Sequence, residues 1–349
     1  MTFSNKYAIL SSITYSLGGN MLNTQNLFTP VLEQMIYLFA FIAIGYLLFK
    51  LNIIPKNAIT TLSKLESTLF IPCLVLSTFI SGFTVEKLTS AGTLLLMSIA
   101  ILAVMIGFAL IVSKLIYKND RYLQKISAYG LSFSNFGYMG NAIVSGVFPH
   151  IFLEYTIFVI PLWIMIYLWG VPSLLIADDR DQKASVPFLQ RLKPLFNPMF
   201  IAMLIGIALG ITGAAAYIPK SVMNVIRVSG DCMSPIAMLL TGMTIAASDL
   251  RKMLTKPKTY ILSLVRLVAI PLLFIFVFAF IPQGSIVNQT FLICAMASLA
   301  MPLGLNTIVV PGGYGKDTTD AAGMALISHT LSIITIPLMF TLFRLLVLQ

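Results

Sequence analysis

Residues 135–144 are Asn-Phe-Gly-Tyr-Met-Gly-Asn-Ala-Ile-Val, and residues 301–309 are Met-Pro-Leu-Gly-Leu-Asn-Thr-Ile-Val. Each stretch interrupts an apolar segment with glycine, asparagine or proline. In a lipid bilayer, irregular backbone is tolerated only where protein or a water-filled cavity satisfies its polar groups. If the chain spans a membrane, the paired interruptions therefore indicate a binding site.

The composition predicts such a membrane protein. Of all residues, 58% are apolar and 10% are charged, and an apolar run of about 20 residues is enough to span a bilayer as a helix. We predict ten spans, at residues 31–51, 57–80, 91–117, 122–148, 152–176, 198–216, 219–247, 258–281, 288–311 and 318–348. The connections are too short for a soluble domain, so the function is expected inside the membrane body.

The basic residues predict an orientation. A net charge of +10 would suggest a nucleic-acid partner in a soluble protein, but here it is interpreted as a topology signal, and no nucleic-acid partner is expected. Of the 22 basic residues, 16 lie in alternate connections that begin after the first span, against five on the opposite side. The positive-inside rule then predicts a multi-pass protein of the cell membrane with both termini outside the cytoplasm.

The chain also contains an internal repeat. Three landmarks recur at separations of 163 to 165 residues: Ile54-Pro55-Lys56 with Ile218-Pro219-Lys220, Pro72 with Pro235, and Asn141 with Asn306. Each copy holds five spans, and because five is odd, the second copy enters the membrane from the opposite side. Inverted repeats are typical of carriers that work by alternating access.

The predicted organisation follows from that repeat. It consists of an N-terminal tail at residues 1–30, a first five-helix repeat at 31–177, a cytoplasmic connecting loop at 178–197 and a second repeat at 198–349. The fold class is thus an all-α membrane protein with two inverted five-helix repeats, in which the fourth and ninth helices carry the interruptions.

Several motifs, in this order, resemble those of the auxin efflux carrier family. They are Gly45-Tyr46, Phe70-Ile-Pro72-Cys-Leu, Ser134-Asn135-Phe-Gly137-Tyr-Met-Gly140, Asn197-Pro198, Pro235-Ile-Ala-Met-Leu-Leu-Thr-Gly242, Arg266-Leu-Val-Ala-Ile-Pro271, Ala300-Met-Pro302-Leu-Gly304 and Leu331-Ser-Ile-Ile-Thr-Ile-Pro337. The resemblance covers about residues 31 to 348. It implies a ten-helix inverted-repeat fold whose fourth and ninth helices cross at the substrate site, with Asn135 and Pro302 at the crossover positions.

The resemblance also suggests a substrate class. The family includes plant auxin carriers and bacterial permeases for malate, malonate and similar organic acids. The short connection between the fifth and sixth spans differs from the long loop of many plant members, so a bacterial-type organic acid permease is the expected subtype.

The two interruptions supply the candidate binding residues. Exposed amides at helix N-termini carry partial positive charge and bind a carboxylate without lysine or arginine. The candidates are Asn135, Gly137, Asn141, Pro302, Gly304, Asn306 and Thr307. The alternative is that their polar groups only join neighbouring helices.

Glu66 is the unusual acid of the chain. We expect it on the apolar face of its helix, with Ile59 and Leu62, about 15 Å of helical rise from residue 56. A carboxylate at that depth is either a functional proton carrier or an acid paired with a cation. Arg266 is a candidate for that cation, and it could equally extend its head group to the cytoplasmic surface.

Two other ionisable sites have structural alternatives. His329 in the tenth span either joins two helices by a hydrogen bond or relays protons. Because of the second possibility, the ion-coupling candidates are Glu66, Arg266 and His329. Arg227 and Asp231 are four residues apart, which predicts an ion pair.

The sequence therefore favours a secondary transporter of a small, malate-like organic anion, with a proton as the first choice of coupling ion. A sodium-coupled carrier of the bile-acid/sodium symporter type is the alternative, followed by a passive channel or sensor. No enzyme and no cofactor are expected, because HExxH, clustered metal ligands and a nucleotide-binding loop are absent from the sequence. Gly206 and Gly210 form a GxxxG motif, suited to packing within the fold or between two copies in a homodimer.

Overall fold

The computed structural model describes residues 27–55, 57–176, 197–247, 256–313, 316 and 318–348, and these are helices joined by short connections. Most of the predicted tail (residues 1–26) and of the connecting loop (178–196) lies outside the described residues, as does Lys56. The helices of the first half are α2 (Phe28–Lys50), α3 (Ala58–Leu65), η1 (Glu66–Phe70), α4 (Ile71–Gly82), α5 (Val85–Ile116), α6 (Arg121–Ser132), η2 (Phe136–Gly140), α7 (Asn141–Val147), η3 (Pro149–Ile151), α8 (Phe152–Phe158), α9 (Ile160–Met165) and η4 (Ile166–Ile176).

The second half continues the pattern. Its helices are α11 (Pro198–Thr212), η6 (Ala214–Tyr217), α12 (Lys220–Asp231), α13 (Met233–Ala246), α15 (Pro257–Leu264), η7 (Val265–Ala269), α16 (Ile270–Ala279), α17 (Gln289–Leu299), α18 (Asn306–Gly313) and α19 (Thr319–Leu346). Of these, η1, η2, η4 and η7 are π-helical segments within longer helices, and η3 and η6 are short 3-10 turns.

Seven helical segments of the described chain are long and apolar enough to cross a membrane, rather than the ten predicted. The predicted spans at 122–148 and 288–311 are each divided by an irregular stretch between two shorter helices. The span at 198–216 contains α11, whose 15 residues rise about 22 Å. It ends where Gly213 adopts a left-handed conformation (φ +69°), a common helix terminator. The ten-span, inverted-repeat arrangement therefore stays a prediction.

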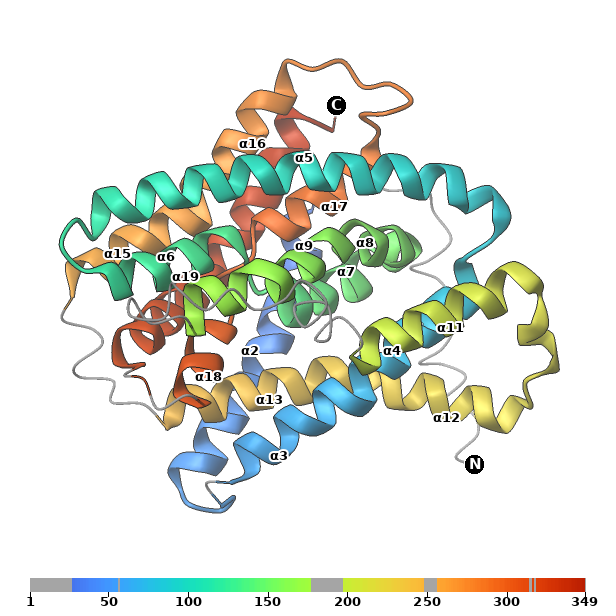
Figure 1. Cartoon of the computed structure of the whole chain (residues 1–349), viewed down its shortest axis with the longest axis horizontal. Coiled ribbons are helices and arrows are strands. Elements are labelled where there is room, and N and C mark those ends of the chain that lie inside the picture. The colour runs from blue at the N-terminus through green and yellow to red at the C-terminus, as the bar shows by residue number, and fades with distance from the viewer. Residues whose placement is uncertain are drawn as a thin grey trace.

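The helices form two packed groups (Figure 1). In the first group, α13 packs along α2, while α11 and α12 pack on α4. In the second, α5 packs on α6 and α8, and α15 and α16 pack on α19. Figure 1 shows α5 on one side, with α16 extending beyond it, and α3, α12 and α13 on the opposite side, with α6 to α9 between them. Contacts of α2 with α7 and α19 join the two groups.

Small residues let the helices of the first group approach closely. The GxxxG motif is used within the fold, because Gly206 and Gly210 face Phe79 and the backbone of α4. A side chain at Gly242 would overlap the carbonyl oxygen of Ile42 on α2. Such approach of helix backbones at small residues is typical of membrane proteins.

We expect Gly242→Val to destabilise the protein by about 1–3 kcal/mol, because the added methyl groups would force α13 away from α2. Thermal denaturation of the detergent-solubilised protein measures the change. Gly107→Val is the matched control, since a Cβ at Gly107 of α5 would meet no other described part of the chain within 4 Å, apart from its own helix. Equal melting temperatures for the two variants would contradict the predicted close packing.

Candidate functional site

The two interrupted segments cross in the structure. Ser134, just after α6, and Leu303, between α17 and α18, form an isolated antiparallel β-bridge. The amide of Asn135 donates to the carbonyl oxygen of Pro302 at 2.8 Å, and Ser134 Oγ donates to the carbonyl oxygen of Ser298 at 2.7 Å. The irregular backbone is thus satisfied by the other segment, as a membrane environment requires.

Gly304 permits this approach of the two segments, because a Cβ on Gly304 would lie 3.1 Å from the carbonyl oxygen of Phe133, tighter than an ordinary contact. Gly137 permits a different contact, since a Cβ there would overlap the ring of Trp163 in α9. The helices that follow, η2 with α7 and then α18, start next to the bridge. The partially positive N-termini of two helices therefore meet at the crossing.

Two of the three candidate asparagines, Asn135 and Asn306, have a side-chain partner in the structure. Asn135 Nδ2 lies 3.0 Å from His329 Nε2, and Asn306 Nδ2 donates to the hydroxyl of Tyr129 at 3.0 Å. Asn135 is buried, whereas Asn306 is partly accessible. Two further candidates also lie at helix starts. Asn141 is buried at the start of α7, and Thr307 Oγ1 at the start of α18 donates to the carbonyl oxygen of Gly304 at 2.8 Å.

His329 adopts a defined tautomer. Its Nδ1 lies 2.7 Å from the carbonyl oxygen of Ala325, which can only accept, so Nδ1 carries the proton. Nε2 then accepts from Asn135. Both ring nitrogens of a neutral imidazole are occupied, which matches the helix-joining alternative from the sequence.

Arg266 joins the ends of the two half-helices that enter the crossing. Its Nε donates to the carbonyl oxygen of Met301 at 2.9 Å, Nη1 to that of Leu131 at 3.0 Å and Nη2 to that of Ser298 at 3.2 Å. The side chain is 1% exposed. A fixed cation thus lies where the partially negative C-termini of α6 and α17 meet.

Glu66 lies elsewhere and is not hydrogen-bonded to Arg266. It is 0% exposed in η1, and neither carboxylate oxygen has a hydrogen-bond partner among the described residues. Its segment contacts α11, α12 and α13, and it lies within electrostatic reach of Tyr138 in η2. Glu66 and Arg266 therefore do not form the suggested pair. Arg266 also does not extend its head group to the cytoplasmic surface, because its side chain is buried at the crossing.

Compared with protein-family models, the chain matches a family described as membrane transport protein over residues 30–340. The chain belongs to this family, the auxin efflux carriers. No curated protein matches the chain. Membership makes this carrier a membrane transporter, which agrees with the expectation that it is not an enzyme.

Several residues at the crossing of this carrier were not predicted as part of the site. Tyr129, Ser134, Ser298 and Leu303 hold the crossing together or position its asparagines. Tyr129 lies 177 residues from its partner Asn306, so no local pattern could reveal the contact. Leu303, by contrast, falls inside the quoted stretch and could have been included.

Proposed function

We propose that this carrier moves a small carboxylate, of the malate class, across the membrane by alternating access, with the substrate bound at the crossing. The observation that supports this proposal is the antiparallel bridge between Ser134 and Leu303, beside which two helix N-termini begin. Two convergent positive helix ends and the amides of Asn135 and Asn306 suit a carboxylate.

The experiment is counterflow of radiolabelled malate in proteoliposomes that contain the full chain and are preloaded with unlabelled malate. A carrier gives transient, saturable accumulation of the label. A passive channel or a sensor gives none, and absence of counterflow with malate, malonate and succinate would reject the proposed substrate class.

We infer further that Glu66 couples transport to a proton. An unpaired, ionised carboxylate is far more costly to bury than its neutral form. Neither carboxylate oxygen of Glu66 has a hydrogen-bond partner in the described part of the chain, and Glu66 lies within electrostatic reach of Tyr138 in the crossing segment. We therefore propose that Glu66 is protonated in this conformation and releases its proton in another.

Glu66→Gln is expected to retain malate counterflow but to lose accumulation driven by a pH gradient. In the unmodified protein, one pH unit can drive about tenfold accumulation per coupled proton, because it is worth about 1.4 kcal/mol. Accumulation is measured in the proteoliposomes with an imposed pH gradient. Glu33→Gln, an exposed acid of α2, is the control and should behave as the unmodified protein. Full accumulation by Glu66→Gln would reject the coupling role.

The sodium-coupled alternative is less well supported. Backbone carbonyls at the ends of broken helices are typical cation ligands in carriers. Here those of Leu131, Ser298 and Met301 accept from the guanidinium of Arg266. The fixed positive charge occupies the position that a coupling cation would need.

We therefore expect malate uptake to be the same in sodium and in choline buffers at equal pH gradients. The measurement is the initial uptake rate in proteoliposomes. Uptake stimulated by an inward sodium gradient would contradict this proposal and favour the bile-acid/sodium symporter type of mechanism.

The orientation remains part of the proposal. The connections on the basic side are proposed to face the cytoplasm, which places both termini and the connections after α4, α7, η6 and α16 outside. A homodimer is not needed for the proposed mechanism.

A further inference from the structure

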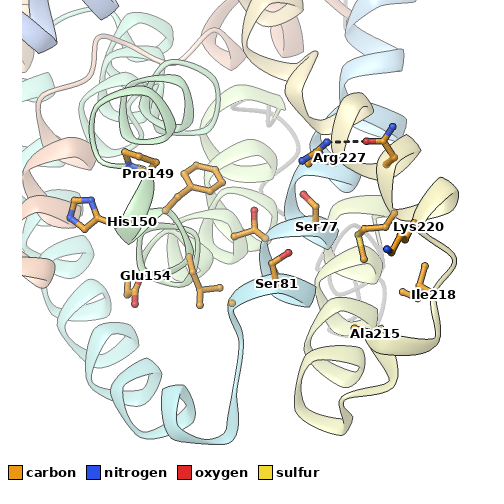
Figure 2. A pocket seen from close by; sticks show the side chains of 15 residues that line it. Ser77, Ser81, Pro149, His150, Glu154, Ala215, Ile218, Lys220 and Arg227 are labelled. Carbon is orange, nitrogen blue, oxygen red and sulfur yellow. Dashed lines mark hydrogen bonds between the residues drawn. The ribbon is translucent and has the colours of Figure 1, made fainter. Parts of the chain in front are cut away.

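A cavity of about 800 Å³ opens between the two helix groups (Figure 2), and its lining residues are not those of the crossing. Its walls come from the end of α4, from η3 and α8, and from η6 and α12. All three walls lie at connections proposed to face the outside. We propose that this cavity is an outer binding site for carboxylate anions, where substrate is held before or after its passage through the crossing. The inference rests on the proposed function.

The cationic side of the cavity is built by one face of α12. Lys220, Met223, Asn224 and Arg227 line the cavity at the spacing of one helical face. The opposite face carries exposed apolar side chains suited to lipid, Val222, Val225 and Val228. The helix therefore turns its charges towards the cavity, as Figure 2 shows for Lys220 and Arg227.

The predicted ion pair between Arg227 and Asp231 is wrong. Arg227 Nη2 instead donates to Asn224 Oδ1 at 2.9 Å, one turn earlier in the helix. Asn224 thereby positions the guanidinium at the cavity. Because a guanidinium has five N–H donors, most of them remain for a carboxylate.

The other walls contribute fewer charges. Ser77 and Thr78 donate their hydroxyl protons to the carbonyl oxygen of Leu74, at 2.9 and 2.7 Å, so they offer little to an anion. Glu154, which has its own interactions, and His150 lie on the side opposite Arg227. Among the described lining residues, two permanent cations against one acid give the cavity a positive balance, which attracts anions.

The electrostatic potential of the cavity can be measured, independently of transport, from the reactivity of an introduced cysteine. Ser81 is an exposed residue on the α4 wall of the cavity, so Ser81→Cys places an accessible thiol there. Cys73 and Cys232, both partly exposed, are replaced by alanine in the same chain. Membrane-impermeant anionic and cationic methanethiosulfonates of similar size are then compared in phosphatidylcholine nanodiscs. Gly284→Cys, in the exposed connection after α16, is the matched reporter outside the cavity.

We expect the anionic reagent to be favoured about tenfold at Ser81→Cys relative to Gly284→Cys, as focusing of charge in a cleft predicts. The preference should disappear when Lys220→Gln and Arg227→Gln are added. Malate should slow the modification of Ser81→Cys and leave Gly284→Cys unchanged. Equal reagent preference at the two positions, or no protection by malate, citrate or sulfate, would overturn the inference.

A lipid headgroup could present the same anionic chemistry. The labelling is therefore repeated in nanodiscs that contain phosphatidylglycerol. Protection by this lipid but not by soluble malate would overturn the inference of a carboxylate site. Since labelling does not need transport, loss of malate counterflow with intact protection would reject only the proposed function, and the reverse result would reject only the outer site.

Discussion

Asn306→Ala is expected to lower the initial rate of malate counterflow about tenfold or more. Asn306 is the first residue of α18, beside the bridge at Leu303, where its side-chain amide can donate to a bound carboxylate. A hydrogen bond to a charged group is worth about 1.5–3 kcal/mol, and about 1.4 kcal/mol corresponds to a tenfold change. The rate is measured in proteoliposomes at equal protein density.

Tyr129→Phe separates this role from helix joining. It removes the protein partner of Asn306, whose Nδ2 donates to the Tyr129 hydroxyl at 3.0 Å, and leaves the amide in place. If Asn306 binds substrate, Tyr129→Phe keeps most of the counterflow. If Asn306 only joins two helices, both variants lose counterflow equally, and that result would contradict the proposed site.

Arg266→Met is expected to destabilise the folded carrier by about 3 kcal/mol or more. The change removes the side-chain donor to the carbonyl oxygens of Leu131 and Met301, and one of two donors to that of Ser298, which still accepts from Ser134 Oγ. Each buried polar group that loses its partner costs about 1–3 kcal/mol. Thermal denaturation in detergent, followed by loss of the monodisperse protein, measures the effect.

Two further variants define the cause. Arg266→Lys keeps the charge but loses the planar arrangement of donors, so an intermediate effect is expected. Arg121→Met removes an exposed arginine from the start of α6 and should leave the melting temperature unchanged. An Arg266→Met protein as stable as this control would show that the three hydrogen bonds do not hold the crossing together.

The location of the crossing could be predicted because its cause is local. Glycine, proline and asparagine mark where a helix stops, and the structure interrupts both helices within residues 133–135 and 300–305. The same breaks divide two of the ten predicted runs, 122–148 and 288–311, into shorter helices, as expected for the fourth and ninth spans.

The partners of the charged groups could not be predicted, because they are defined only by the fold. Arg266 donates to the backbone carbonyls of three residues that precede it in the sequence by 135 positions or follow it by 35 and 32 positions. Because every residue has a carbonyl, the sequence holds no signal for these contacts. The sequence suggested an acid for Arg266, but Glu66 lies in a different environment, near Tyr138. Likewise, Arg227 contacts Asn224 rather than Asp231.

The most direct test of the substrate site is a cryo-electron microscopy map of the full-length carrier in nanodiscs with saturating malate, compared with a map without malate. The proposal predicts additional density at the crossing, between the starts of η2 and α18, within hydrogen-bonding distance of Asn135 or Asn306. If malate undergoes counterflow but its density is absent from the crossing and appears elsewhere in the membrane body, the proposed site is wrong.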